Sequence, residues 1–179
     1  MGKPSRPLGA SSGPFKNARA FFVTSVTWER RKLFQSERMS RLFLETLYAY
    51  RGRTSFLLHE FALMPDHFHL LLSVPTGTTL EKIVQFVKGG FSYQARKELR
   101  FTSEIRQRGF ADEYILTGHD FEIKKRYIRE NPVAAGLVDC EDKYPYSLPR
   151  TARLKACPFA GDMDLSFRCG RARIYPCAM

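Results

Sequence analysis

The chain has 179 residues, of which 44% are hydrophobic, so its length and composition predict one domain with a packed core. Lys and Arg number 29 against 18 Asp and Glu, and the formal net charge of +11 indicates a polyanionic partner, nucleic acid first, with simple solubility as the alternative. No apolar stretch approaches the ~20 residues that cross a membrane, and the first residues lack the apolar segment of a secretory signal, so we expect a cytoplasmic protein without a membrane partner.

Residues 1–18 are rich in Ser, Pro, Gly and Lys, which predicts a disordered basic arm. The folded domain is expected over residues 19–149. Residues 150–179 lose periodicity and are interpreted as a basic C-terminal tail. No two cysteines form a C-x-x-C pair, so we expect reduced thiols and no zinc ribbon; they are Cys140, Cys157, Cys169 and Cys177.

The first half of the domain predicts three strands and a helix. Residues 21–28 are β-branched and aromatic, which favours a strand. Apolar residues at helical spacing predict an amphipathic helix over residues 36–50, stopped near Gly52. Residues 56–64 and 67–74 are expected to be two strands joined by a tight turn.

The second half predicts two helices around a short extended segment. A helix is expected over residues 79–99, weakened or bent by the paired glycines at 89–90. Residues 106–115 favour a short strand or an extended turn. A capping box then starts a helix over residues 117–130, which the Asn-Pro pair at 131–132 is expected to end, since the residue before proline disfavours helical geometry.

This order of elements predicts an α+β sandwich of the ferredoxin or RRM-like type. Its central antiparallel sheet carries residues 67–74 on an inner strand. We expect helices on one face of the sheet and a free opposite face for a substrate.

Two histidines separated by one residue open the third predicted strand. His67 and His69 must point to the same face while Phe68 points to the other, because side chains alternate along a strand. A matched imidazole pair is a bidentate metal site. The alternative is a hydrogen-bonded polar pair without a metal.

The last predicted helix carries a second group of chemical interest. Tyr127 and Asn131 are four residues apart and therefore share one helix face, which could present a nucleophile and a metal-binding carbonyl oxygen together. Tyrosine is a poor base, and a phosphotyrosine linkage that stores the energy of a broken phosphodiester is one use for it as a nucleophile. Tyr127 as an ordinary half-buried tyrosine, and Asn131 as the N-cap of a short turn ending near Gly136, are the alternatives.

Three ordered blocks carry a resemblance to a known family. Residues 61–72, 107–110 and 127–138 resemble the signature blocks of the IS200-like, single-tyrosine (Y1) HUH transposases, and the resemblance covers about residues 20–147. The closest branch is the REP-associated tyrosine transposases, which also tend to carry the element at 144–147. The resemblance implies a sheet that carries the HUH motif, and nicking and strand transfer of single-stranded DNA through a 5′-phosphotyrosine with a free 3′-OH. It also implies Mg²⁺ or Mn²⁺, REP-like hairpin DNA as partner, and a bacterial, nucleoid-associated location.

Carried over residue by residue, His67 and His69 match the HUH histidines and Tyr127 matches the nucleophile. Asn131 matches a polar third-ligand position. Arg106 departs from the pattern, because relatives often have Trp before the second block, which questions local packing or base stacking there. The resemblance leaves open whether the protein is a monomer or a homodimer.

Four basic residues are candidate DNA contacts. Lys88, Arg96 and Lys97 lie on the long predicted helix, and Arg108 belongs to the second signature block. For the three residues on the helix, the alternative is an ordinary solvated surface charge. Two other functions compete with the transposase: a hairpin-binding DNA or RNA protein that has lost turnover, and an H-x-H metal hydrolase, which normally needs more ligands and a longer chain.

Overall fold

The computed structural model describes residues 19–105 and 108–148, so the predicted arm, the predicted tail and Arg106 lie outside the described residues. Three short 3-10 turns join the main elements: η1 (Trp28–Arg30), η2 (Leu33–Gln35) and η3 (Glu141–Lys143). The strands and helices are β1 (Arg19–Val26), α1 (Glu37–Thr54), β2 (Leu57–Leu63), β3 (His67–Val74), α2 (Leu80–Leu99), β4 (Ala111–Ile115) and α3 (Gly118–Ala134).

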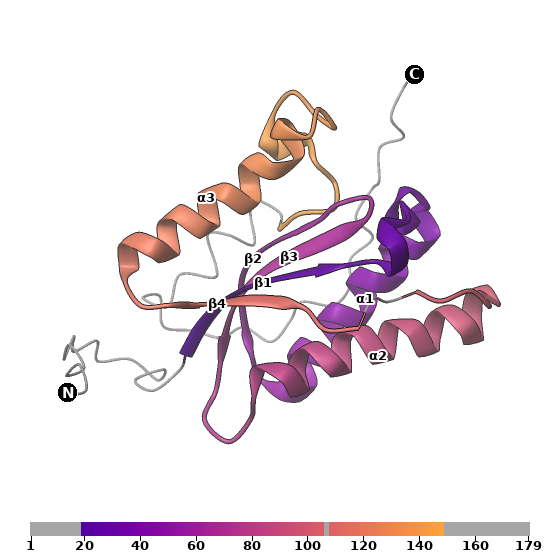
Figure 1. Cartoon of the computed structure of the whole chain (residues 1–179), viewed down its shortest axis with the longest axis horizontal. Helices are drawn as coiled ribbons and strands as arrows, with labels where there is room; N and C mark the ends of the chain where they lie inside the picture. Colours follow the sequence, from indigo (N-terminus) through magenta and orange to yellow (C-terminus); the bar gives the residue numbers. More distant parts are fainter. Residues whose placement is uncertain (1–18, 106–107, 149–179) are drawn as a thin grey trace.

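The four strands form one antiparallel sheet in the order β2-β3-β1-β4. With helices after β1 and β3, this order gives the split βαβ arrangement of ferredoxin-like folds and confirms the predicted α+β class. β3 is an inner strand, as the sequence indicated. Figure 1 shows α1 and α2 on one side of the sheet and α3 on the other.

The larger core lies between the sheet and the helices α1 and α2. Phe68, Leu70 and Leu72 point from β3 into this core and are at most 5% exposed. The Phe43 ring of α1 lies 4.8 Å from the Phe68 ring and 5.3 Å from the Phe91 ring of α2. The burial of these apolar side chains excludes water from the α1 and α2 side of the sheet. His67 and His69 point to the other side, which α3 covers.

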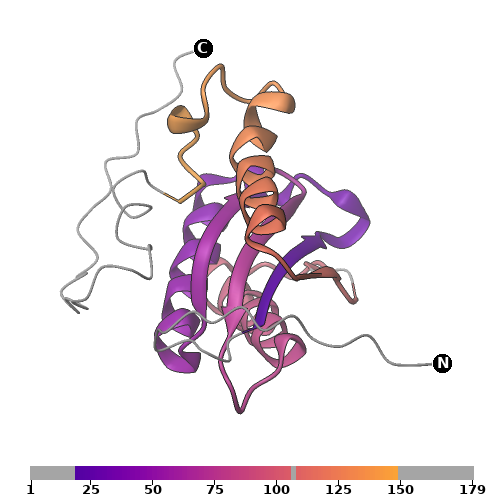
Figure 2. The same ribbon diagram turned by 90° about the vertical axis from the view of Figure 1, so that its left-hand side faces the viewer.

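The opposite face, which the sequence predicted to be free, is partly covered by α3. Ile128 of α3 is fully buried in a second, smaller core. This cluster includes residues from β2, β3 and β4, and Figure 2 shows α3 lying over the strands. Its other buried members are Ala62, Met64, Leu71 and Ile115.

α1 ends two residues beyond the predicted stop near Gly52, and α2 spans nearly the whole predicted range with its paired glycines inside. α1 runs past Gly52 to Thr54 and ends at Ser55, whose φ of 54° is left-handed. α2 is one continuous helix through the paired glycines. A Cβ atom on Gly90 would collide with the ring of Tyr50, so this glycine permits the close approach of α1 and α2.

The end of α3 also differs from the prediction. Thr117 Oγ1 accepts a hydrogen bond from the Asp120 amide at 3.1 Å, as the capping pattern indicated, but the helix continues through Pro132 to Ala134. Asn131 lies inside this helix, so its interpretation as the N-cap of a separate turn is wrong. The helix ends in a Schellman motif in which Gly136 has a φ of 67°.

A β-bulge in β2 changes which side chains face α3. Leu58 pairs with Leu72 but Glu60 pairs with Leu71, so one extra residue, His59, lies between them. His59 Nε2 lies 2.7 Å from Ser73 Oγ. The bulge therefore directs both His59 and Glu60 toward α3.

The pKa of His59 falls from 6.5 to about 4 because burial disfavours the charged ring, with the nearby positive charges adding to the effect. As the pH drops below about 6.5, His59 is therefore protonated in the unfolded chain before it is protonated in the folded protein. Stability that is present at neutral pH is lost between about pH 6.5 and 4.

His59→Gln removes this titration while keeping a side chain that can bond Ser73. Between pH 7 and 4.5 the variant should lose about 2 kcal/mol less unfolding free energy than the unmodified protein, since one pKa unit corresponds to about 1.4 kcal/mol. Urea denaturation at the two pH values measures this difference. Equal losses in both proteins would show that His59 titrates normally.

Candidate active site

The histidine pair lies on the face of the sheet that α3 covers. His67 Nε2 and His69 Nε2 are 3.1 Å apart. The other ring nitrogens are held from behind: His67 Nδ1 bonds the Asp66 carboxylate, and His69 Nδ1 lies 2.8 Å from Thr24 Oγ1. When each Nδ1–H donates to its oxygen partner, both Nε2 atoms present lone pairs to one point.

The surroundings of the pair keep His69 neutral. His69 is 4% exposed, and burial, together with the charge of His67, lowers its pKa to about 4. Burial of Asp66 opposes ionisation, but the hydrogen bond and charge of His67, with those of Arg30, hold its pKa below the ordinary value. A neutral buried imidazole and a second imidazole oriented by a carboxylate are both features that metal sites use.

The two Nε2 atoms fit a divalent cation. Adjacent ligands of an octahedral ion with bonds of about 2.1 Å lie about 3 Å apart, close to the observed separation. Within residues 19–105 and 108–148, no group of three or more His, Cys, Asp or Glu side chains could hold a metal ion. Further ligands would be amide, water or phosphate oxygens, which Mg²⁺ and Mn²⁺ accept.

α3 brings Tyr127 to the same place. Its ring centre lies 5.4 Å from that of His69 and 5.8 Å from that of Phe22, and the residue is 47% exposed. Tyr114 is an exposed tyrosine on β4, shortly before α3 in the chain. Its ring contacts Phe21 on the opposite face of the sheet. Of these two tyrosines, Tyr127 is the one beside the histidines.

Asn131 lies one turn after Tyr127 on α3, as the four-residue spacing predicts. Its backbone carbonyl accepts the Ala135 amide at 2.9 Å. The role of its side chain as a third ligand stays a prediction.

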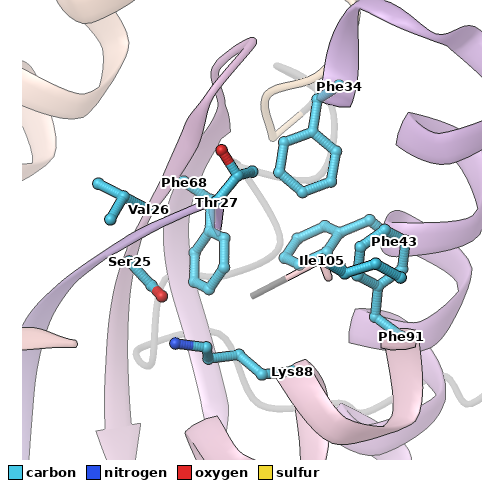
Figure 3. A pocket seen from close by; sticks show the side chains of 9 residues that line it. All are labelled: Ser25, Val26, Thr27, Phe34, Phe43, Phe68, Lys88, Phe91 and Ile105. Atoms are coloured by element: carbon cyan, nitrogen blue, oxygen red, sulfur yellow. The ribbon is translucent and has the colours of Figure 1, made fainter. Parts of the chain in front are cut away.

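The predicted DNA contacts on α2 are not brought to this site. Lys88 is only 7% exposed and its ammonium donates to the Gly109 carbonyl, which argues against the predicted phosphate contact. Figure 3 shows Lys88 beside Ser25 among the side chains of a pocket in the larger core. Arg96 and Lys97 are exposed, but α2 packs on the other side of the sheet from the histidines.

Arg108 is exposed and precedes β4 by three residues. The start of β4 is in register with Thr24, which in turn pairs with His69. Arg108 therefore approaches the end of the sheet that carries the histidines, and its contact with DNA stays a prediction.

Three residues of the site were missed by the sequence analysis. Thr24 pairs with His69 across the sheet, and Phe22 stacks on the His69 ring at 5.4 Å. Lys124 places its ammonium 5.0 Å from the Phe22 ring centre. Only the strand register and the docking of α3 bring these residues together. The contact of Asp66 could have been inferred, since a carboxylate directly before a histidine is a common orienting partner.

The chain matches a known family over most of the domain. The family model described as Transposase IS200 like matches residues 18–131, well over half of the chain. The chain belongs to the IS200-like transposase family. This confirms the resemblance seen in the signature blocks and places the chain among DNA-processing enzymes.

Individual relatives agree with the family. A Haemophilus influenzae protein named "Putative REP-associated tyrosine transposase" is 26% identical over 170 residues, which cover 86% of this chain and 94% of the relative. The solved structure of a REP-associated tyrosine transposase bound to a REP hairpin matches with a TM-score of 0.65 at 20% identity, over 97% of this chain and 99% of that one. At that identity the match shows a shared fold. The described helices include none long and apolar enough to cross a membrane.

Proposed function

We propose that this IS200-like transposase nicks single-stranded DNA and transfers the strand through a 5′-phosphotyrosine on Tyr127. The observation that carries the proposal is the position of Tyr127, half-exposed and 5.4 Å between ring centres from His69, although the two residues lie in distant parts of the chain. The family membership supports a DNA-strand reaction at this place. The H-x-H hydrolase alternative lacks the additional ligands among the described side chains.

The reaction follows from a phenol placed beside a phosphate-binding centre. Tyr127 Oη forms a bond to the phosphorus, and the bond from phosphorus to the 3′ oxygen breaks. The phenol loses its proton and the departing 3′ oxygen gains one. The protein is then linked to the 5′ side of the nick, and attack by another 3′-OH on this linkage reverses the chemistry and joins a new strand.

His67, His69 and Asn131 would hold Mg²⁺ or Mn²⁺. When bound, the cation would polarise the scissile phosphate and neutralise charge that develops on its oxygens. Asp66 and Thr24 orient the two imidazoles through their Nδ1 atoms.

Hairpin DNA is the proposed substrate class. The net charge of +11 favours a polyanion, and a protein of the same fold is solved with a REP hairpin bound. The scissile phosphate must reach both the face of the sheet and the tyrosine of α3, which a regular duplex would hinder. A single-stranded stretch beside the hairpin stem meets this requirement.

Tyr127→Phe tests the nucleophile, because it removes one oxygen and leaves the ring contacts with Phe22 and His69. With a labelled hairpin oligonucleotide and Mn²⁺, the unmodified protein should form a covalent adduct on the 5′ side and release a free 3′-OH. The variant should form no adduct, with a change in stability of at most ~1 kcal/mol. Denaturing gels and peptide mapping measure both products.

Tyr114→Phe is the matched control and should form adduct at the normal rate. An adduct mapped to Tyr114, or to a serine, would contradict the assignment. Hairpin binding without any adduct in the unmodified protein would favour the second candidate, a binding protein that has lost turnover.

His67→Ala and His69→Ala test the cation site. Each should abolish cleavage, while the hairpin Kd changes by less than about threefold, because affinity comes mostly from phosphate contacts by basic side chains. Single-turnover cleavage and fluorescence anisotropy separate the two effects. Cleavage at the normal rate by either variant contradicts the site.

Asp66→Asn tests the orientation of His67. An amide is a weaker acceptor than a carboxylate for the His67 Nδ1–H, so Mn²⁺ affinity should fall about 10- to 100-fold. Electron paramagnetic resonance titration of free Mn²⁺ measures the loss without any DNA. Asp112→Asn, an exposed change on β4, should leave Mn²⁺ affinity unchanged.

A further inference from the structure

A lysine lies beside the candidate site without a role in the proposed chemistry. Lys124 is on α3, three residues before Tyr127, and its ammonium is 5.0 Å from the Phe22 ring centre. The same ring contacts His69 at 5.4 Å and Tyr127 at 5.8 Å. Phe22 is therefore a shared neighbour of the lysine, the histidine and the tyrosine.

Glu113 holds the ammonium in this place. Glu113 pairs with Phe22 in the β1–β4 register, and its Oε2 atom is 2.7 Å from Lys124 Nζ. The Glu113 side chain is 54% exposed and that of Lys124 is 25% exposed. An ion pair so open to water contributes little to stability, so another anion can replace the carboxylate at little cost.

We propose that Lys124 binds a phosphodiester of the DNA strand in the active site, and that Glu113 occupies its ammonium in the absence of DNA. On binding, the ammonium donates to a non-bridging phosphate oxygen, and the Glu113 carboxylate returns to water. The assignment rests on the proposed function for its substrate. It places a positive charge on the histidine side of the sheet, where the predicted contacts on α2 do not lie.

The neighbouring residue provides a matched control. Lys125 has the same side-chain exposure of 25% and pairs with Glu122 at 3.8 Å within the helix. Its charge lowers the pKa of His59 on β2, after the larger effect of burial. Residues two apart lie on opposite sides of a helix, so Lys125 and Tyr127 face different ways. Lys124→Met and Lys125→Met therefore remove the same charge from the same helix at different places.

The first experiment measures hairpin affinity against salt concentration, using Tyr127→Phe as the background so that no cleavage interferes. Lys124→Met should weaken binding about tenfold at low salt and reduce the slope of log K against log salt by about 0.7 to 0.9, the loss of one phosphate contact. Lys125→Met should change affinity by less than about twofold. In the protein with Tyr127 intact, Lys124→Met should also slow single-turnover cleavage, and Lys124→Arg should restore most of it.

Glu113→Gln separates a phosphate contact from a structural ion pair. If the pair only fixes β4 to α3, losing either partner harms the protein in the same way. If Glu113 competes with phosphate for Lys124, Glu113→Gln should bind the hairpin as well as or better than the background protein. Asp112→Asn, which removes a neighbouring acid that has no such partner role, controls for the general loss of negative charge.

Two results would overturn the proposal: an unchanged salt slope in Lys124→Met, or a loss of affinity in Glu113→Gln as large as that in Lys124→Met. Thermal unfolding of each variant confirms that the compared proteins are folded. Failure of the proposed function is a separate result, since it shows as a missing adduct on Tyr127 while the binding comparison still tests Lys124.

Discussion

The packing of α3 on the sheet is the contact on which the rest of the site depends. Ile128 is fully buried, and its neighbours Tyr127 and Arg129 project about 100° to either side of it, as successive helix residues do. Arg129 Nε donates to the fully buried Glu60 carboxylate at 2.7 Å, while Tyr127 lies against His69. The buried Ile128 side chain and the Arg129–Glu60 ion pair together fix the rotation of α3 about its axis. This rotation sets the position of Tyr127. Removing Arg129 would take the charged partner away from a fully buried carboxylate, and breaking a buried ion pair in this way costs about 3–5 kcal/mol.

The turn before β3 gives the histidines a rigid base. The Thr27 amide and its Oγ1 donate to the Asp66 carbonyl at 2.8 and 2.9 Å, which ties this turn to the end of β1. Asp66 bonds His67, and Thr24 of β1 has its Oγ1 atom 2.8 Å from His69 Nδ1. Both imidazoles are therefore oriented by groups that the β1–β3 pairing holds in place. A site built on paired strands and supported in this way needs little rearrangement to bind a ligand.

The two faces of the sheet differ in how they are packed. The face under α1 and α2 packs many aromatic side chains. Lys88 is buried on this face, where it is 7% exposed and donates to the Gly109 carbonyl. The face under α3 has the smaller core and leaves Tyr127 47% exposed. The high positive charge of the chain indicates the class of partner, but the interaction of each basic residue depends on which face receives it.

The sequence by itself determined the local structure and the candidate residues of the site. Alternation over residues 67–74 put His67 and His69 on one face, helical spacing put Tyr127 and Asn131 on one helix, and the order of elements gave the fold class, because these patterns depend on backbone geometry within a few residues. The tertiary structure decided the rest. It placed α3 over the histidines, produced the bulge beside Glu60, and carried α3 through Pro132. Strand register and helix docking are set by contacts between residues far apart in the chain. The spacing of residues within one segment therefore does not predict them.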